Sequence, residues 1–170
     1  MSHIDNKVDW CLKKAEKELA ESDKHRGLIK ISIDSALAQS HIVKAEHNLK
    51  AITEFKRIGY SDWSASATFY SIYHCFLAIL AKHGYESRNQ ECTFALIRQL
   101  IGQKQINLDM TLVDQVNILE PDAAHEASTV VGVRELEQYG IKLSLEDDKY
   151  NTLLGLAKNI LDKTKEILQS

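Results

Sequence analysis

One stretch decides the fold: residues 62–84, with the sequence DWSASATFYSIYHCFLAILAKHG. Asp62 is of a type that caps helices and Gly84 of a type that ends them, so we predict one helix between them that ends near His83. Apolar side chains occupy most of its circumference, namely Trp63, Phe69, Tyr70, Ile72, Tyr73, Phe76, Leu77, Ile79 and Leu80. A helix that is apolar on most sides needs neighbours all round, so this one is expected in the middle of a helical bundle.

Six further segments have apolar residues at helical spacing. Their approximate bounds are 6–24, 32–57, 89–101, 108–119, 122–139 and 144–168. Gly27 breaks the chain before the second of them, and Pro121 stops the fourth. Asp122 can cap the next helix, and Ser144 with Asp147 approximates a capping box for the last. The pattern predicts an all-α fold, an antiparallel up-and-down bundle of five to seven helices, in a single domain over residues 1–170.

Composition agrees with long helices. The 170 residues include one Pro and seven Gly, too few turn residues for an all-β protein. Hydrophobic residues make up 44% and charged residues 26%, as in globular proteins. The net charge of −3 gives no overall electrostatic footprint for nucleic acid, although a local basic patch remains open.

Location follows from the apolar segments and the cysteines. The most apolar stretch, Phe69–Ala81, is too short to span a bilayer, and the first ten residues do not resemble a signal peptide. Cys11, Cys75 and Cys92 form no CxxC pair, so we interpret them as buried thiols in a reducing compartment rather than as a disulfide framework or zinc site. We therefore predict a cytoplasmic protein with no membrane contact.

Two stretches resemble the HEPN (higher eukaryotes and prokaryotes nucleotide-binding) family. The first comprises KAEHNL (44–49), IGYSD (58–62), ATFYSIYH (67–74) and AIL (78–80) followed by Gly84. The second is VRELEQYG (133–140), just before the last helix, where the family carries its Arg-centred motif. The resemblance covers about residues 36–168, and it leaves 1–31 as an N-terminal helical extension.

The resemblance implies a bundle that commonly forms a homodimer, with the Arg motif facing a groove between subunits. Catalytic members resemble metal-independent ribonucleases in which a His follows the Arg by four to six residues. Here Arg134 is followed by Tyr139, and no His occurs after His125. An ordinary His titrates near pH 6.5 and a Tyr near 10, so Tyr139 is a poor general base at neutral pH. The Arg…Tyr variant is similar to a HEPN branch often paired with a minimal nucleotidyltransferase, which implies a partner protein and a toxin–antitoxin role.

Arg134 is the main candidate for binding. It is the one Lys or Arg between Gln105 and Ile141, a span with seven acidic residues. It can hold a phosphate, or it can tie its acidic helix to neighbours through ion pairs. Ala123, Ala127 and Val130 lead to it at helical spacing, so it is expected to point inward or into a groove.

Other candidates lie nearby in the predicted bundle. Tyr139 can donate a hydrogen bond to a phosphate, or it can cover the core with its hydroxyl in water. Tyr70 and His74 share one face of the central helix, where they either pack in the core or bring His74 opposite Arg134 as the missing imidazole. Glu135 and Glu137 are expected in solvent or beside Arg134; at this spacing they do not form a catalytic pair.

The sequence shows no metal or cofactor signature. His125 lacks the second His of the zincin spacing, and His41 and His47 project nearly opposite on their helix. A basic segment with Lys44, Lys50, Lys56 and Arg57 is interpreted as a solvated helix face, with RNA contact as the alternative.

Three functions follow from these residues. The leading hypothesis is a non-catalytic HEPN-like binding protein that holds a nucleotide or RNA phosphate at Arg134 or docks with a nucleotidyltransferase. The second is a metal-independent RNA endonuclease that uses Arg134 with Tyr139 or His74. The third is a structural adaptor. A homodimer is expected, because the central helix and the N-terminal helix both carry apolar surface that a second subunit can cover.

Overall fold

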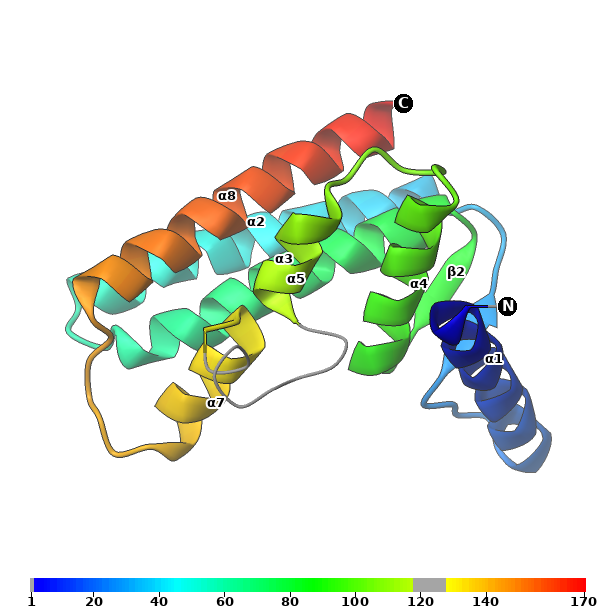
Figure 1. The fold of residues 1–170 in the computed structure, drawn as a ribbon, viewed down its shortest axis with the longest axis horizontal. Coiled ribbons are helices and arrows are strands. Elements are labelled where there is room, and N and C mark those ends of the chain that lie inside the picture. The colour runs from blue at the N-terminus through cyan, green and yellow to red at the C-terminus, as the bar shows by residue number, and fades with distance from the viewer. Residues whose placement is uncertain (1, 118–127) are drawn as a thin grey trace.

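Three long helices lie side by side along the molecule (Figure 1). The computed structural model describes residues 2–117 and 128–170. The long helices are α2 (Ser35–Arg57), α3 (Asp62–Lys82) and α8 (Asp147–Gln169). α2 and α3 form an antiparallel pair joined by a short turn, and α8 packs against both.

Four shorter helices complete the fold. They are α1 (His3–Glu21), α4 (Gln90–Gly102), α5 (Met110–Val116) and α7 (Val130–Tyr139). α4 crosses one end of the long helices, and α1 packs on α4 at the edge of the molecule (Figure 1). The described residues therefore contain seven helices, and the all-α bundle is confirmed. The predicted segments 108–119 and 122–139, with Pro121 and Asp122, lie partly outside the described residues.

The direction of α8 is set by contacts at both of its ends. At the start of α8, the backbone N–H of Leu145 donates to Ser61 Oγ over 2.9 Å, beside the start of α3. At the far end, the Lys82 ammonium donates to the carbonyl oxygens of Ile167 and Leu168 over 3.1 and 2.8 Å. α8 therefore runs parallel to α3 and antiparallel to α2. The elements α4, α5 and α7 lie in the sequence between the end of α3 and the start of α8.

The starts of α4 and α3 differ in whether the residue at the cap position uses its side chain to cap the helix. Asn89 caps α4 through its side chain, which accepts from the backbone N–H of Cys92. At α3, Ser61 and not Asp62 occupies the cap position, and its hydroxyl accepts from Leu145 instead of capping the helix. The predicted use of Asp62 as a cap is wrong, because α3 already includes Asp62 as its first residue.

The predicted capping box at the last helix is also wrong. Glu146 holds the cap position of α8 without a side-chain hydrogen bond to the helix. Asp147 is bound instead by Lys56 at the end of α2, with 2.7 Å between Nζ and Oδ1. This contact lowers the pKa of the Asp147 carboxyl through a hydrogen bond and a favourable charge.

Two short strands were not predicted. β1 (Leu28–Lys30) and β2 (Tyr85–Ser87) pair antiparallel, with Leu28 opposite Ser87. Gly84 precedes β2 with φ of +78°, a backbone conformation that favours glycine, so α3 ends where predicted and the chain turns into the strand. Strands of three residues are too short to show the alternation from which a strand is predicted.

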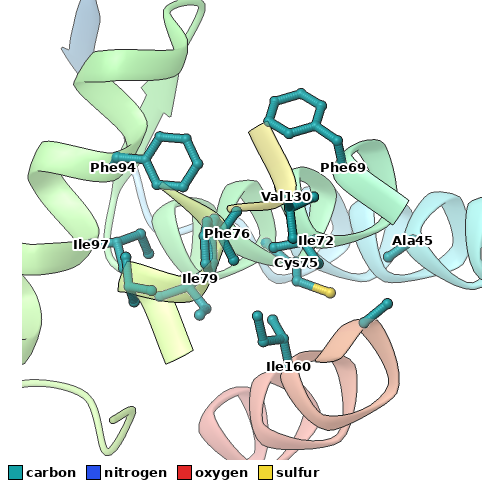
Figure 2. Close-up of a cluster of buried hydrophobic side chains, with 14 of the residues drawn as sticks. Ala45, Phe69, Ile72, Cys75, Phe76, Ile79, Phe94, Ile97, Val130 and Ile160 are labelled. Carbon is teal, nitrogen blue, oxygen red and sulfur yellow. The ribbon is translucent and has the colours of Figure 1, made fainter. Parts of the chain in front are cut away.

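The centre of the molecule is α3. It buries thirteen of its 21 residues. Figure 2 shows Ile72, Phe76 and Ile79 among side chains from α4, α7 and α8, and Phe76 meets Phe94 edge to face at 5.7 Å between ring centroids. The predicted central position of this helix is confirmed.

α3 is also the one helix among the described residues that is long and apolar enough to cross a membrane. The rest of the chain buries 72% of its most apolar window. A core helix of a globular domain has the same properties, so its composition is explained by packing.

The cysteines depart from the prediction. Cys11 of α1 and Cys92 of α4 form a disulfide across 81 residues of sequence. The expectation of three free thiols is therefore wrong for two of them, because a pairing set by tertiary contact leaves no local spacing signal. Cys75 is a buried free thiol as expected, and burial raises its pKa to about 12. The cytoplasmic location stays a prediction. The disulfide removes one argument for it, which was that all three cysteines are unpaired.

Candidate functional site

Arg134 lies against the face of a buried aromatic ring. Three buried residues at the start of α7, Val130, Val131 and Val133, anchor the helix on the core. The guanidinium carbon of Arg134 consequently sits 4.1 Å from the centroid of Phe69 on α3. This is a cation–π contact at close range, and the side chain is only 15% exposed. The prediction that Arg134 points inward or into a groove, and not freely into water, is confirmed. Ala123 and Ala127, from whose spacing the prediction was partly made, lie outside the described residues.

The guanidinium of Arg134 has few partners for its charge and its N–H groups. Its Nε atom is buried and has no hydrogen-bond partner among the described residues. The Oε1 atom of Glu135, whose side chain is half exposed, lies 3.9 Å from the Nη2 atom. A buried guanidinium nitrogen without a partner is costly, and a bound acceptor oxygen would lower that cost.

Phe69 is the centre of an aromatic cluster formed with Tyr70 and Tyr73. Tyr73 stacks on Phe69 with 5.6 Å between centroids and 13° between planes, and Tyr70 meets Phe69 edge-on at 5.2 Å. Tyr70 is 48% exposed, while Tyr73 is partly buried and its hydroxyl lies 3.3 Å from Thr93 Oγ1. Burial raises the pKa of Tyr73, so it remains a neutral phenol. Of the predicted residues, Arg134 and Tyr70 therefore meet at the same ring.

His74 faces another histidine. Its Nδ1 atom lies 3.0 Å from Nδ1 of His41 on α2, and its ring touches Tyr73 edge-on at 6.4 Å. Burial, followed by the nearby His41 and Lys44, lowers the pKa of His74 to about 4. Burial also lowers the pKa of His41, although Glu86 opposes the shift. His74 is thus connected to Arg134 only through the rings of Tyr73 and Phe69.

Tyr139 lies away from this cluster. Its side chain is 80% exposed at the end of α7, and within residues 2–117 and 128–170 no hydrogen bond or ring contact involves it. The interpretation that it covers the core is wrong, because the side chain projects into solvent at the last residue of α7. Tyr139 stays a candidate for binding only through its open hydroxyl.

Glu137 is not solvated as expected. Its Oε2 atom is buried without a hydrogen-bond partner among the described residues, one turn from Arg134 on α7. Glu137 also lines a hollow of about 150 Å³ between the start of α3 and the loop after α7, together with Trp63, Ser66, Ile141 and Leu143. An unpaired carboxylate oxygen in such a place opposes a bound anion nearby.

Three of the side chains that line this hollow are apolar and exposed. We call them the apolar patch: Trp63, Ile141 and Leu143. Ile141 and Leu143 are 97% and 82% exposed. Apolar side chains exposed to this degree and in a group often mark an interaction surface.

Two of the four basic residues in the α2 segment are paired with carboxylates, while Lys44 and Lys50 are exposed. Lys56 binds Asp147 and lies 4.1 Å from the ring centroid of Tyr150, while Arg57 pairs with Glu54 at 2.7 Å. These contacts favour the interpretation of a solvated and paired helix face.

Sequence reasoning missed three parts of this region: Phe69 as the contact of Arg134, His41 as the contact of His74, and Arg98. Arg98 is 1% exposed and pairs with Asp114 over 2.6 Å; its second Nη also donates to the Asn117 carbonyl. All three depend on contacts between residues far apart in the sequence, so no local pattern of residues indicates them. The aromatic spacing 69–70–73 on the central helix was the one available signal for the cluster.

Comparison with models of known protein families and with curated proteins found no match. The geometry around Arg134 is therefore the ground on which a function is assigned.

Proposed function

We propose that this protein is a HEPN-like, non-catalytic binding protein that holds a phosphate of a nucleotide or of RNA at Arg134. The observation that carries the proposal is the state of Arg134. It is held over Phe69 with a buried Nε that lacks a partner, and its nearest carboxylate oxygen is 3.9 Å away. A phosphate offers acceptor oxygens in the geometry that a guanidinium binds best.

The aromatic cluster supports a nucleotide rather than a simple anion. Tyr70 is half exposed beside the ring that carries Arg134. Bases stack on exposed aromatic side chains with little dependence on sequence. A ligand with a phosphate on Arg134 and a base on Tyr70 would use both features together.

The properties of His74 and Tyr139 support a binding protein that does not catalyse RNA cleavage. With a pKa of about 4, His74 is neutral near pH 7 and is a weak base there. Tyr139 is in solvent and has no described neighbour that would activate its hydroxyl. The endonuclease alternative, with Arg134 and either of these residues, therefore has little acid–base support.

Binding is tested by titrating the protein with AMP, ATP and a short single-stranded RNA without metal. We expect saturable binding that Arg134→Ala weakens about tenfold or more, since a hydrogen bond to a charged group contributes about 1.5–3 kcal/mol. Arg57→Ala removes an exposed arginine from α2 and is the matched control, with unchanged affinity expected. Glu137→Gln removes the opposing carboxylate and should strengthen binding. Equal affinity of the wild type and Arg134→Ala would exclude this site.

Catalysis is tested on the same RNA in the presence of a chelator. We expect intact RNA after prolonged incubation with the wild type. Cleavage that Arg134→Ala abolishes would replace the binding proposal with the endonuclease alternative.

A second function, self-association, is favoured by the apolar patch. The original reason for expecting a homodimer has weakened, because this chain itself covers α3, and α1 packs on α4. Ile141 and Leu143 now provide the reason. Lys142 and Glu146 beside them lie 4.0 Å apart and offset one another's charge, so the surroundings do not oppose contact between two copies of the same surface.

Self-association is measured by light scattering at micromolar concentration. We expect a dimeric mass for the wild type and a monomeric mass for the double variant Ile141→Asp/Leu143→Asp. The matched control is Ile33→Asp, an exposed apolar residue before α2 that lies outside the patch. A monomeric wild type would exclude self-association, and the apolar patch would then be a binding surface for a different protein. The HEPN resemblance suggests a nucleotidyltransferase as that protein.

A further inference from the structure

Two histidines face one another between the two most closely packed helices. His41 on α2 and His74 on α3 have ring centroids 5.2 Å apart and planes inclined by 34°. Their Nδ1 atoms approach to 3.0 Å. Both rings are half-buried, so one edge of the pair is open to water.

The backbone beneath the pair is held in place. Ser71 donates to the carbonyl of Ala45 over 2.9 Å, one turn from each histidine, and Ser64 donates to the carbonyl of Ile52 over 2.8 Å. These buried bonds cross the same α2–α3 interface. The separation of the two imidazoles is therefore set by rigid helices and not by mobile loops.

Of the two Nδ1 atoms that face one another, one carries a proton and the other has a free lone pair. Both pKa values lie below the ordinary 6.5, so both imidazoles are neutral near pH 7. Of two neutral rings joined through Nδ1 atoms, one donates its proton and the other accepts it. Neutral imidazole is the form that binds metal ions.

The spacing of the nitrogens matches a shared metal ion. With metal–nitrogen distances of about 2.0–2.1 Å, two ligand nitrogens lie about 3.3 Å apart at a tetrahedral angle and about 2.9 Å apart at a right angle. The observed 3.0 Å falls between these separations. When an ion binds, the proton on the donor ring moves from Nδ1 to Nε2, so that both rings stay neutral and both Nδ1 lone pairs are free. Each ring then turns until its lone pair points at the ion.

We propose that His41 and His74 bind a divalent late transition metal ion, of the class Ni²⁺, Cu²⁺ and Zn²⁺, between α2 and α3. Imidazole nitrogen suits these ions, whereas Mg²⁺ and Ca²⁺ prefer oxygen. Groups of three or more His, Cys, Asp or Glu suited to a metal do not occur in the described part of the chain, so water fills the remaining positions.

The site was invisible in the sequence. The prediction of no metal site compared His41 with His47 on one helix, where they diverge. His74 joins His41 only because α2 and α3 are antiparallel neighbours. The proposal does not depend on phosphate binding, because Arg134 meets α3 from α7 and the two histidines meet between α3 and α2.

The test uses the full chain without an affinity tag, stripped of metal by a chelator. His3 lies near the amino terminus, where an amine and an imidazole together can bind Cu²⁺ and Ni²⁺, so every protein in the test carries His3→Ala. Calorimetric titration with NiCl₂ and ZnCl₂ is expected to show one saturable ion per chain, and MgCl₂ none. Thermal unfolding should shift upward with the bound ion, because the ion binds only the folded arrangement.

His41→Ala and His74→Ala should each weaken binding by more than the roughly tenfold that loss of an outer-shell partner costs. His47→Ala, an exposed histidine of the same α2 helix, is the matched control with unchanged affinity. Circular dichroism verifies that each variant keeps its helix content. Absence of saturable binding, or an affinity in both variants equal to that of the protein with both histidines, would overturn the proposal.

A second measurement does not need the variants to fold. Electron paramagnetic resonance of the Cu²⁺-loaded protein should show hyperfine coupling to two imidazole nitrogens. Coordination by oxygen alone would mean that the histidines only share a proton.

Discussion

At the scale of single residues, Phe69 has the largest role in the candidate site. It is nearly fully buried, and it contacts Arg134 on one side and Tyr70 and Tyr73 on the others. Its ring both fills the core and supplies the negative face that holds the guanidinium. Position and chemistry of the site thus depend on the same side chain.

Phe69→Leu keeps the apolar volume close to that of the ring but removes the aromatic face. We expect it to lower the free energy of unfolding by about 1–2 kcal/mol and to weaken nucleotide binding as well. Phe94→Leu is the matched control, since Phe94 is equally buried and packs edge-on against Phe76. Urea unfolding should show similar losses for both, with binding weakened only in Phe69→Leu. Equal binding in the two variants would contradict a role of the aromatic face.

His74 makes stability depend on pH. Its pKa of about 4 in the folded protein is below the ordinary 6.5, mainly through burial. Between these values the unfolded chain binds more protons than the folded one. The contribution to stability is therefore complete above pH 6.5 and is lost as the pH falls toward 4. His41, whose pKa is also lowered by burial, acts in the same direction.

Urea unfolding at pH 7 and at pH 5 measures this effect. The free energy of unfolding should fall less between the two pH values in His74→Gln than in the wild type. His47→Gln, at an exposed position of α2, should retain the full decrease. A His74→Gln protein with the wild-type pH dependence would show that the pair carries no such linkage.

At the scale of elements, α1 is attached to the bundle through α4. Val8, Cys11 and Ala15 form its buried face, and Lys7 pairs with Glu91 over 2.7 Å. Gly27 then fits under α1, where an added Cβ would lie 2.5 Å from the Cys11 carbonyl oxygen. The disulfide of Cys11 with Cys92 fastens an element that has few other contacts with the long helices.

Reduction of this disulfide should lower the free energy of unfolding by about 4 kcal/mol, because the bond closes a loop across 81 residues. Cys11→Ser/Cys92→Ser should match the reduced protein and lose its response to reductant. Cys75→Ala is the control, and it should keep that response, because Cys75 is buried and unpaired. Calorimetric melting with and without reductant gives the comparison; an unchanged melting temperature would contradict a stabilising disulfide.

At the scale of the whole molecule, one apolar core connects all helices. The cluster of buried residues runs from Val8 in α1 to Ile167 in α8. Trp10 belongs to α1 and Trp63 to the first turn of α3. The helix α1 and the start of α3 lie at different ends of the fold (Figure 1). A continuous core favours unfolding in one cooperative step.

Single-tryptophan variants test that cooperativity with the disulfide intact. Trp10→Phe leaves Trp63 as the reporter, and Trp63→Phe leaves Trp10. We expect both fluorescence transitions in urea to coincide with loss of helix by circular dichroism. An earlier transition at Trp10 would mean that α1 and the rest of the chain unfold as separate units.

The sequence by itself determined the helices and the central place of α3. Apolar periodicity and helix-ending residues are local, and an apolar circumference can only be buried in the middle. It also indicated that Arg134 points inward, because helical spacing fixes direction. The tertiary structure alone decided the hydrogen bond from Leu145 to Ser61, the Cys11–Cys92 bond and the contact of His41 with His74. Each joins residues from different elements, and only the packing of the helices brings such residues within reach.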